Sequence, residues 1–198
     1  PNYNSVVATF CYNITRNIPI EVSGRTRSLK LVYIDDAVAE FMAALQGSAH
    51  ADLDGFYSVP SIHMTTLGEI ADALYSFKES REGSLQVPDV GHPFLKKLYS
   101  TYLSYLPVDE FSYALDTHAD DRGSFTEILR TAERGQFSVN IAHPGVVKGN
   151  HWHHTKNEKF LVVSGKGLIR FRRVDEPGRE VIEYHVSGKK LQVVDIPP

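Results

Sequence analysis

The chain has 198 residues, of which 42% are apolar, 11% aromatic and 23% charged. This is the composition of a soluble globular protein with enough apolar mass for a core, and it excludes disordered and fibrous chains. The net charge is −3 and neither half carries a basic stripe, which argues against nucleic acid as a partner. No apolar run reaches the roughly 20 residues that a membrane-spanning helix needs. For this reason we expect no membrane partner. The single Cys11 can form no internal disulfide, which agrees with a reducing compartment, so we expect a cytoplasmic protein.

Up to about residue 106 the hydrophobic period is helical and is broken by short apolar runs, which is typical of an α/β segment. Helix starts are indicated by a serine cap at Ser5 and by the capping box Thr66-x-x-Glu69. The expected helices run from Ser5 to before Pro19, from Asp35 and Asp36 to about Gln46, from Thr66 onward, and over 94–106 as a linker. The expected strands cover 18–22, 29–34 and 56–59.

Beyond residue 106 the pattern changes to short alternating strands separated by turns with glycine or polar residues. The expected strands cover 111–115, 125–129, 137–142, 151–154, 160–163, 168–174, 181–186 and 191–196. Evenly spaced short strands are typical of a sandwich or a barrel. The change of pattern therefore predicts two domains, 1–106 and 107–198.

Four of the nine histidines lie between residues 143 and 154. On a strand, His151 and His153 share one face because side chains alternate, and His154 lies on the other face. Glu158 follows a polar turn, so a hairpin would bring its carboxylate beside the two imidazoles. Two nitrogens and one oxygen then converge, which favours a metal site; the alternative is a hydrophilic strand with surface histidines.

The spacing Gly145-x5-His151-x-His153-x4-Glu158-x6-Gly165 resembles the first conserved motif of the cupin superfamily at every fixed position. The resemblance implies a double-stranded β-helix (jelly-roll barrel) over 107–198. It also implies that His151, His153 and Glu158 hold zinc or another divalent metal. In cupins a second motif supplies a further histidine, and this sequence stops where that motif would begin. We therefore expect an incomplete cupin with weak metal affinity.

The segments PNYNSVVATFCYNITRNIPIEV and RTRSLKLVYIDDAVAEFMAAL resemble the latter part of extended short-chain dehydrogenases/reductases that act on nucleotide sugars. This resemblance implies an incomplete substrate-binding lobe over 1–106, with Asn4 and Arg27 facing substrate. For Arg27, a solvated turn charge competes with a diphosphate contact. The sequence has neither a glycine-rich dinucleotide loop nor a Tyr-x-x-x-Lys motif, so we expect the NADPH-binding half to lie upstream and to be absent here.

Together with DRGSFTEILRT and GNHWHHTKNEKFLVVSGKG, the two parts resemble the CapF-type bifunctional enzymes of capsular polysaccharide synthesis. The resemblance implies a UDP-linked 4-keto-6-deoxy-N-acetylhexosamine substrate. Its C3 is epimerised in the zinc-containing cupin domain and its C4 is reduced with NADPH, towards UDP-N-acetyl-L-fucosamine. It further implies a homodimer, and a fragment of this extent is expected to be inactive alone.

The residues that flank the histidine motif supply candidates for proton transfer. Lys148 and His154 lie beside the motif, and Arg122 lies in an acidic-basic loop that resembles the opening of sugar-epimerase cupins. A solvated side chain is the competing interpretation for each. For the whole protein, the main alternative is a non-catalytic sugar-binding or regulatory cupin that a metal stabilises. A stand-alone metal-dependent dioxygenase is a third hypothesis, against which the nucleotide-sugar lobe argues.

Overall fold

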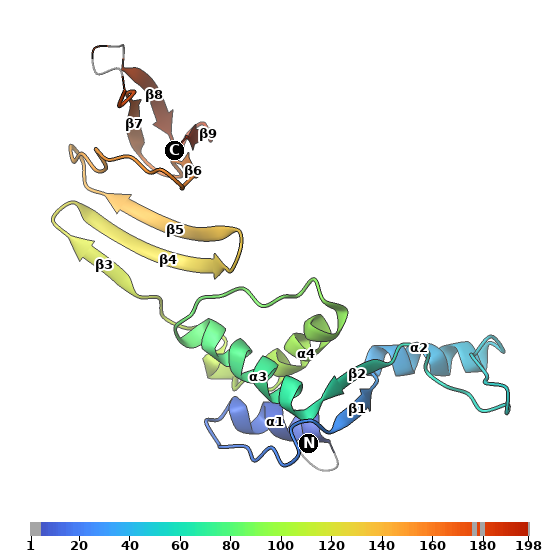
Figure 1. Cartoon of the computed structure of the whole chain (residues 1–198). Helices are drawn as coiled ribbons and strands as arrows, with labels where there is room; N and C mark the ends of the chain where they lie inside the picture. Colours follow the sequence, from blue (N-terminus) through green and yellow to red (C-terminus); the bar gives the residue numbers. More distant parts are fainter. Residues whose placement is uncertain (1–4, 176–177, 179–180, 198) are drawn as a thin grey trace. The chain divides into compact units, whose positions relative to one another are not determined.

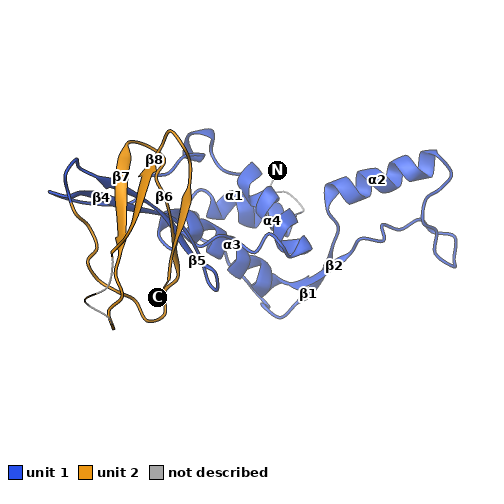
Figure 2. Ribbon diagram, turned by 90° about the horizontal axis from the view of Figure 1, so that it is seen from above, with its two compact units in different colours: residues 1–146 blue, residues 147–198 orange. Residues whose placement is uncertain are grey.

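The computed structural model describes residues 5–175, 178 and 181–197. The chain divides into two compact units, which we call unit 1 (residues 1–146) and unit 2 (residues 147–198) (Figure 2). Asn4, expected to face substrate, lies outside the described residues. The domain boundary between residues 106 and 107 stays a prediction.

Three helices enclose the main hydrophobic core of unit 1 (Figure 1): α1 (Val6–Ile14), α3 (Leu67–Glu82) and α4 (Pro93–Ser104). Each turns the apolar stripe of its sequence inward, as an amphipathic helix does. The buried cluster consists of Phe10, Cys11, Ile14, Ile70, Ala71, Leu74, Phe77, Leu98, Tyr102 and Leu106. The linker helix expected over 94–106 is thus confirmed as a helix, and it packs into this core.

The helix starts read from the sequence are confirmed by their side-chain caps. Ser5 Oγ accepts a hydrogen bond from the backbone N–H of Ala8 at 3.3 Å. In the capping box, Thr66 Oγ1 accepts from the N–H of Glu69 at 3.2 Å, and Glu69 Oε2 accepts from the N–H of Thr66 at 2.7 Å. These bonds satisfy backbone donors that the first helical turn leaves without partners.

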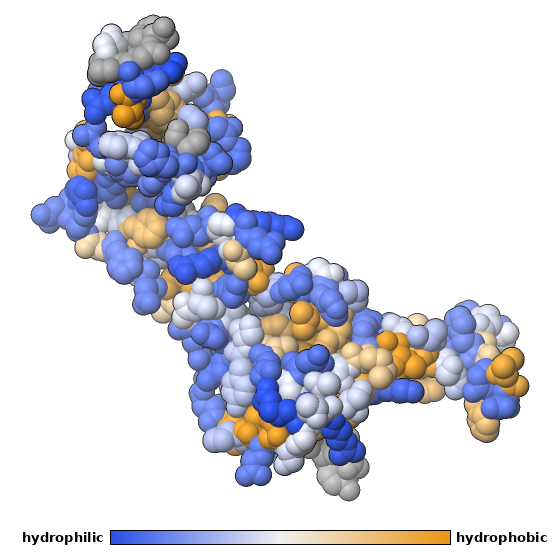
Figure 3. All heavy atoms as spheres, in the orientation of Figure 1, coloured by the Kyte–Doolittle hydropathy of each residue, from blue (hydrophilic) through white to orange (hydrophobic). Residues whose placement is uncertain are grey.

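Between α1 and α3 the chain forms β1 (Ser28–Leu31), α2 (Ile34–Leu45) and β2 (His63–Thr66). The two strands pair antiparallel, with Ser28 opposite Thr66. The helix expected from Asp35 is confirmed, yet none of its residues is buried. Apolar side chains at helical spacing, among them Val38, Phe41 and Leu45, stay exposed, and Figure 3 shows apolar surface on this segment.

Three strand predictions in this region need correction. Residues 18–22 form no strand, because Pro19 lacks an N–H and the segment instead packs Ile20 and Val22 against the helical core. Residues 56–59 form no strand either, because Asp52 Oδ1 accepts from two backbone N–H groups and closes a tight loop. The strand expected over 29–34 ends at Leu31, since α2 already begins at Ile34.

Unit 1 continues with a short 3-10 helix, η1 (Val108–Glu110), and a three-stranded antiparallel sheet. Its strands are β3 (Thr117–Asp120), β4 (Gly123–Thr131) and β5 (Gly135–Ala142), in the order β3-β4-β5. The strands expected over 125–129 and 137–142 are confirmed. The strand expected over 111–115 is wrong, because Tyr113 there lies against the Arg81 guanidinium of α3 instead of entering a ladder. β3 was not predicted from the sequence, because its four residues show no alternation of apolar side chains; all four are exposed.

Unit 2 consists of two antiparallel strand pairs. β6 (Glu158–Leu161) pairs with β9 (Val193–Ile196), and β7 (Lys166–Phe171) pairs with β8 (Ile182–Ser187). Four of the expected strands are thus found, whereas residues 151–154 form no ladder with another strand. The overall class is therefore mixed, with an α/β first part followed by several small β sheets. The cupin barrel itself stays a prediction.

Across the described ranges, no helix is long and apolar enough to cross a membrane.

Candidate functional site

The imidazoles of His151 and His153 meet in unit 2. Their Nε2 atoms lie 3.2 Å apart, and the two rings stand edge to face with centroids 4.8 Å apart. The segment makes no ladder, but its side chains still alternate as in an extended strand, so residues two apart share a side. At this distance a single proton, or a cation in its place, can lie between the two nitrogens.

The spacing of the two nitrogens suits a metal ligand pair. Zinc–nitrogen bonds of about 2.0–2.1 Å at a tetrahedral angle place two ligand nitrogens roughly 3.3–3.4 Å apart. The observed 3.2 Å between His151 Nε2 and His153 Nε2 is close to that separation. The imidazole pair therefore fits two positions of a metal coordination shell.

Glu158, the first residue of β6, stands beside this pair. Its Oε2 lies 3.9 Å from His153 Nε2, and its Oε1 lies 3.9 Å from Lys156 Nζ. The separation from His153 is wider than that between the two imidazoles. Within the part of the chain that the structure describes, no group of three or more histidine, cysteine and acidic side chains meets the requirements of a metal site. The third ligand position stays a prediction.

On the other side of the same segment, His154 contacts Trp152. Trp152 Nε1 donates a hydrogen bond to His154 Nε2 at 3.2 Å, and the rings lie edge to face with centroids 6.4 Å apart. The proton of a neutral His154 is thereby assigned to Nδ1, because Nε2 is the acceptor. The position of His154 away from the imidazole pair agrees with the expected alternation. Lys148, the other candidate beside the motif, is exposed.

Arg122 lies in unit 1, in the turn between β3 and β4. Its Nε and Nη2 donate to Asp120 Oδ2 at 2.9 and 2.6 Å, and this carboxylate raises the pKa of the guanidinium. The next residue, Gly123, has a φ of 132°, and a Cβ there would lie 2.0 Å from the carbonyl oxygen of Ile141. Glycine is thus required where this turn enters the sheet.

Arg27 immediately precedes β1, and it is exposed. Its backbone is held at both ends, since its N–H donates to the Gly24 carbonyl and its carbonyl accepts from the Leu67 N–H. No side-chain partner of Arg27 occurs among the described residues. The guanidinium is therefore available for an anion.

Sequence reasoning did not identify a polar cluster that joins α2, β2 and α4. Lys97 Nζ lies 2.5 Å from Asp36 Oδ2 and 3.3 Å from His63 Nε2, and the Lys97 hydrogen bond lowers the pKa of Asp36. The partners lie 61 and 34 residues apart, so no local motif could have signalled them. The cluster shows that Asp36, interpreted as a helix-start carboxylate, also anchors α4 to this region.

Comparison with known proteins finds a family model that matches the second part of the chain. Residues 118–198 match the model of the Polysaccharide biosynthesis C-terminal domain. The chain is 44% identical over all its 198 residues to the UDP-2-acetamido-2,6-beta-L-arabino-hexul-4-ose reductase of Pseudomonas aeruginosa, of which it covers 52%. A shorter match, 33% identical over 57 residues, is to the spore coat polysaccharide biosynthesis protein SpsL of Bacillus subtilis; it covers 26% of this chain and 38% of SpsL.

Solved structures agree with these sequence matches. The capsular polysaccharide assembling protein CapF of Staphylococcus aureus is 59% identical, with a TM-score of 0.90, over 100% of this chain and 52% of the CapF chain. CapF with the inhibitor 3-isopropenyl-tropolone superposes with a TM-score of 0.93 at 59% identity, over 100% of this chain and 56% of that one. The chain therefore spans about half the length of the relatives that it matches in full.

Proposed function

We propose, from the premise that this chain is a CapF-type protein by homology over its whole length, that it forms part of an enzyme of capsular nucleotide-sugar synthesis. The substrate in this proposal is a UDP-linked 4-keto-6-deoxy-N-acetylhexosamine. Residues 107–198 contribute the epimerisation at C3, and residues 1–106 contribute to the lobe in which C4 is reduced with NADPH. The product leads towards UDP-N-acetyl-L-fucosamine, and the enzyme is a cytoplasmic homodimer.

One observation carries the proposal: the imidazole pair of His151 and His153 at a separation suited to a shared metal ion, with Glu158 beside it. These are the residues that the cupin motif assigns as ligands. When bound, a divalent metal would supply a Lewis acid for the ketone oxygen of the substrate. Removal of a proton from the carbon next to a ketone needs such stabilisation of the oxygen, because the negative charge moves onto it.

The other candidate residues would supply the remaining chemistry in this proposal. Lys148 and His154 are the candidates for moving a proton at C3, one on each face of the sugar. Arg122 donates from Nε and Nη2 to Asp120, and the N–H groups of Nη1 are directed to an anionic substrate in this proposal. Arg27 would contact the diphosphate from the reductase lobe.

One of the matched CapF structures contains the inhibitor 3-isopropenyl-tropolone. A tropolone carries a carbonyl and a hydroxyl on adjacent ring carbons, and two such oxygens chelate a divalent metal. The proposal therefore extends to this chain: a tropolone should compete with other chelators for the metal bound at His151 and His153.

The proposal is tested by solvent exchange in a protein of the relatives' full length that contains this chain. In heavy water with the UDP-4-keto sugar, deuterium should appear at C3, measured by mass spectrometry of the recovered nucleotide sugar. His153→Ala and Glu158→Ala should lose this label, while NADPH oxidation on a ketosugar that needs no epimerisation continues. Lys159→Ala is the matched control, because Lys159 follows Glu158 on β6 and pairs with Asp195.

The same experiment separates the alternative. A non-catalytic sugar-binding cupin would bind the nucleotide sugar without placing deuterium at C3. Label that survives the combined loss of His151, His153 and Glu158 would remove the epimerase role from this cluster.

A further inference from the structure

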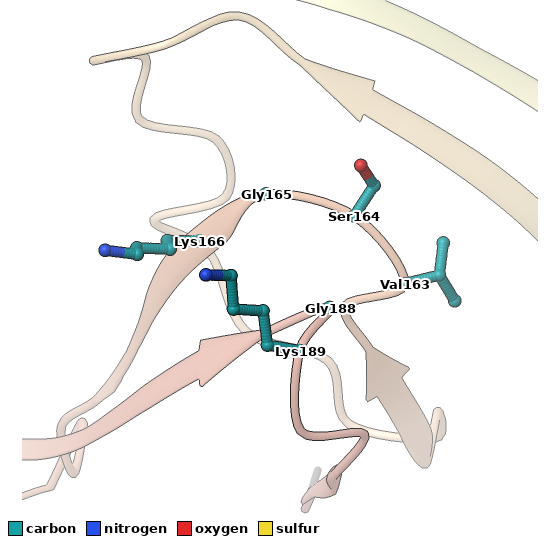
Figure 4. A pocket seen from close by; sticks show the side chains of 6 residues that line it. All are labelled: Val163, Ser164, Gly165, Lys166, Gly188 and Lys189. Carbon is teal, nitrogen blue, oxygen red and sulfur yellow. The ribbon is translucent and has the colours of Figure 1, made fainter.

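Two turns of unit 2 meet around a hollow of about 310 Å³ (Figure 4). One turn joins β6 to β7 and the other follows β8, and they are tied together where the Gly188 N–H donates to the Gly165 carbonyl at 3.1 Å. The lining residues are Val163, Ser164, Gly165, Lys166, Gly188 and Lys189. A Cβ on Gly188 would lie 2.4 Å from the Val163 carbonyl oxygen, so glycine is needed for this close approach.

The hollow is positively charged. The side chains of Lys166 and Lys189 extend on the same side of the two turns, whereas Ser164 and Val163 point away from them (Figure 4). Neither ammonium group has an ion-pair partner among the described residues. Other basic side chains of unit 2 do hold carboxylates: Lys159 pairs with Asp195, Arg170 with Glu183 and Arg173 with Asp175.

We propose that this hollow, with Lys166 and Lys189, binds a small phosphate-bearing anion. Two like charges on one side of a concave surface repel each other, and a multivalent anion between them turns that repulsion into attraction. Lysine binds phosphate as a compact point charge and does not require the planar geometry of arginine. The inference goes beyond the proposed function and does not depend on it.

The size of the hollow favours more than a single phosphate group. On the same measure a single water needs only about 10–15 Å³, so the hollow is far larger than one water site. Its 310 Å³ also falls at the lower end of the range of about 300–1,000 Å³ for small-molecule sites. A diphosphate or a small phosphorylated metabolite fits this size.

The anion site is separate from the imidazole pair. Five residues of extended chain lead from Glu158 to Val163, which at about 3.3 Å per residue is roughly 17 Å. The diphosphate of a nucleotide sugar is bonded directly to the sugar. The imidazole pair precedes the start of β6 and the hollow follows its end, so the ligand that we propose for the hollow is a second anion and not this diphosphate.

The test is a titration of the 198-residue chain with inorganic pyrophosphate at constant ionic strength, followed by amide ¹H–¹⁵N NMR. We expect saturable shifts at Ser164, Gly165, Gly188 and Lys189, with a dissociation constant below roughly 5 mM. Lys166→Ala and Lys189→Ala should each weaken binding at least about fivefold, and the double variant should abolish saturation. Lys190→Ala is the matched control, because Lys190 is the next residue along and does not line the hollow; it should change the affinity less than twofold.

Several outcomes overturn the proposal. Shifts that rise without saturation, or that sodium sulfate at equal ionic strength reproduces in full, indicate nonspecific screening. If Lys190→Ala weakens pyrophosphate binding as much as Lys189→Ala does, binding depends on the positive charge of this segment and not on the hollow. The chain could also sediment with anionic vesicles, lose this in the same lysine variants, and not bind pyrophosphate. That result would assign the two lysines to binding a membrane surface. Basic segments that bind such surfaces usually carry about four to eight lysines or arginines, more than line this hollow.

Discussion

Replacing His153 with alanine should remove most of the metal affinity that we propose for this chain. His153 is the residue between the other two candidate ligands, with its Nε2 3.2 Å from His151 Nε2 and 3.9 Å from Glu158 Oε2. Four-ligand structural zinc sites hold their metal with about 10–16 kcal/mol, or about 2.5–4 kcal/mol per ligand. Since about 1.4 kcal/mol corresponds to a factor of ten, loss of one ligand should weaken binding by roughly two to three orders of magnitude.

The assay uses the only tryptophan of the chain, Trp152, which lies between His151 and His153 in sequence. Binding of Co²⁺ or Cu²⁺ beside it should quench its fluorescence, and calorimetry with Zn²⁺ gives the dissociation constant directly. His154→Ala is the control: it removes the acceptor of the Trp152 hydrogen bond but no candidate ligand. This variant should change the metal affinity less than about threefold, because it removes only a neighbouring hydrogen bond and no bond to the metal.

Equal weakening by His153→Ala and His154→Ala would refute the assignment, because it would show that the chain binds metal through any exposed histidine. A wild-type chain that takes up zinc with no change in Trp152 emission would place the metal elsewhere.

Three further predictions concern the fold of unit 1. Gly123→Ala should destabilise it by more than about 2 kcal/mol in urea unfolding followed by circular dichroism, because a Cβ would lie 2.0 Å from the Ile141 carbonyl oxygen; an unchanged midpoint would contradict this. The backbone N–H of Thr66 lowers the pKa of Glu69, so this bond stabilises the fold above about pH 4.3 and is lost as the pH falls through the lower folded value. Glu69→Gln should therefore lower the melting temperature at pH 7 but not near pH 2, and a constant difference between the two pH values would argue against the linkage. Burial raises the pKa of the Cys11 thiol to about 12, so a thiol reagent at pH 8 should react only as unit 1 unfolds, and rapid labelling of the native chain would disprove this burial.

The helices of this protein were predicted well because each carries its signals within one or two turns. The serine before α1 and the Thr66-x-x-Glu69 box bond to backbone groups three residues away, so their geometry is local. In α3, Ile70 and Leu74 follow the same helical apolar period, and both are fully buried. In α2 the same kind of pattern predicted the helix correctly, although none of its residues is buried.

Strands were predicted less well because a strand needs a partner that the local sequence does not specify. Residues 18–22 and 111–115 have suitable apolar side chains, but no neighbouring strand offers them a ladder. β3 has four exposed residues and no apolar alternation, and it forms because a tight turn brings it against β4. For the histidines, period-two alternation was sufficient: it places His151 with His153 and Trp152 with His154 even without a ladder.

The sequence was enough to identify the protein family and the donors that could share a metal, because motif spacing and side-chain alternation are properties of a short stretch of backbone. It could not show that Lys97 joins Asp36 and His63, or that Lys166 and Lys189 line one hollow. Those pairs lie far apart in the chain, and they meet because helix packing and the closure of two turns bring distant backbone segments together. Contacts of that kind depend on the free energy of the whole fold, which no local pattern of residues encodes.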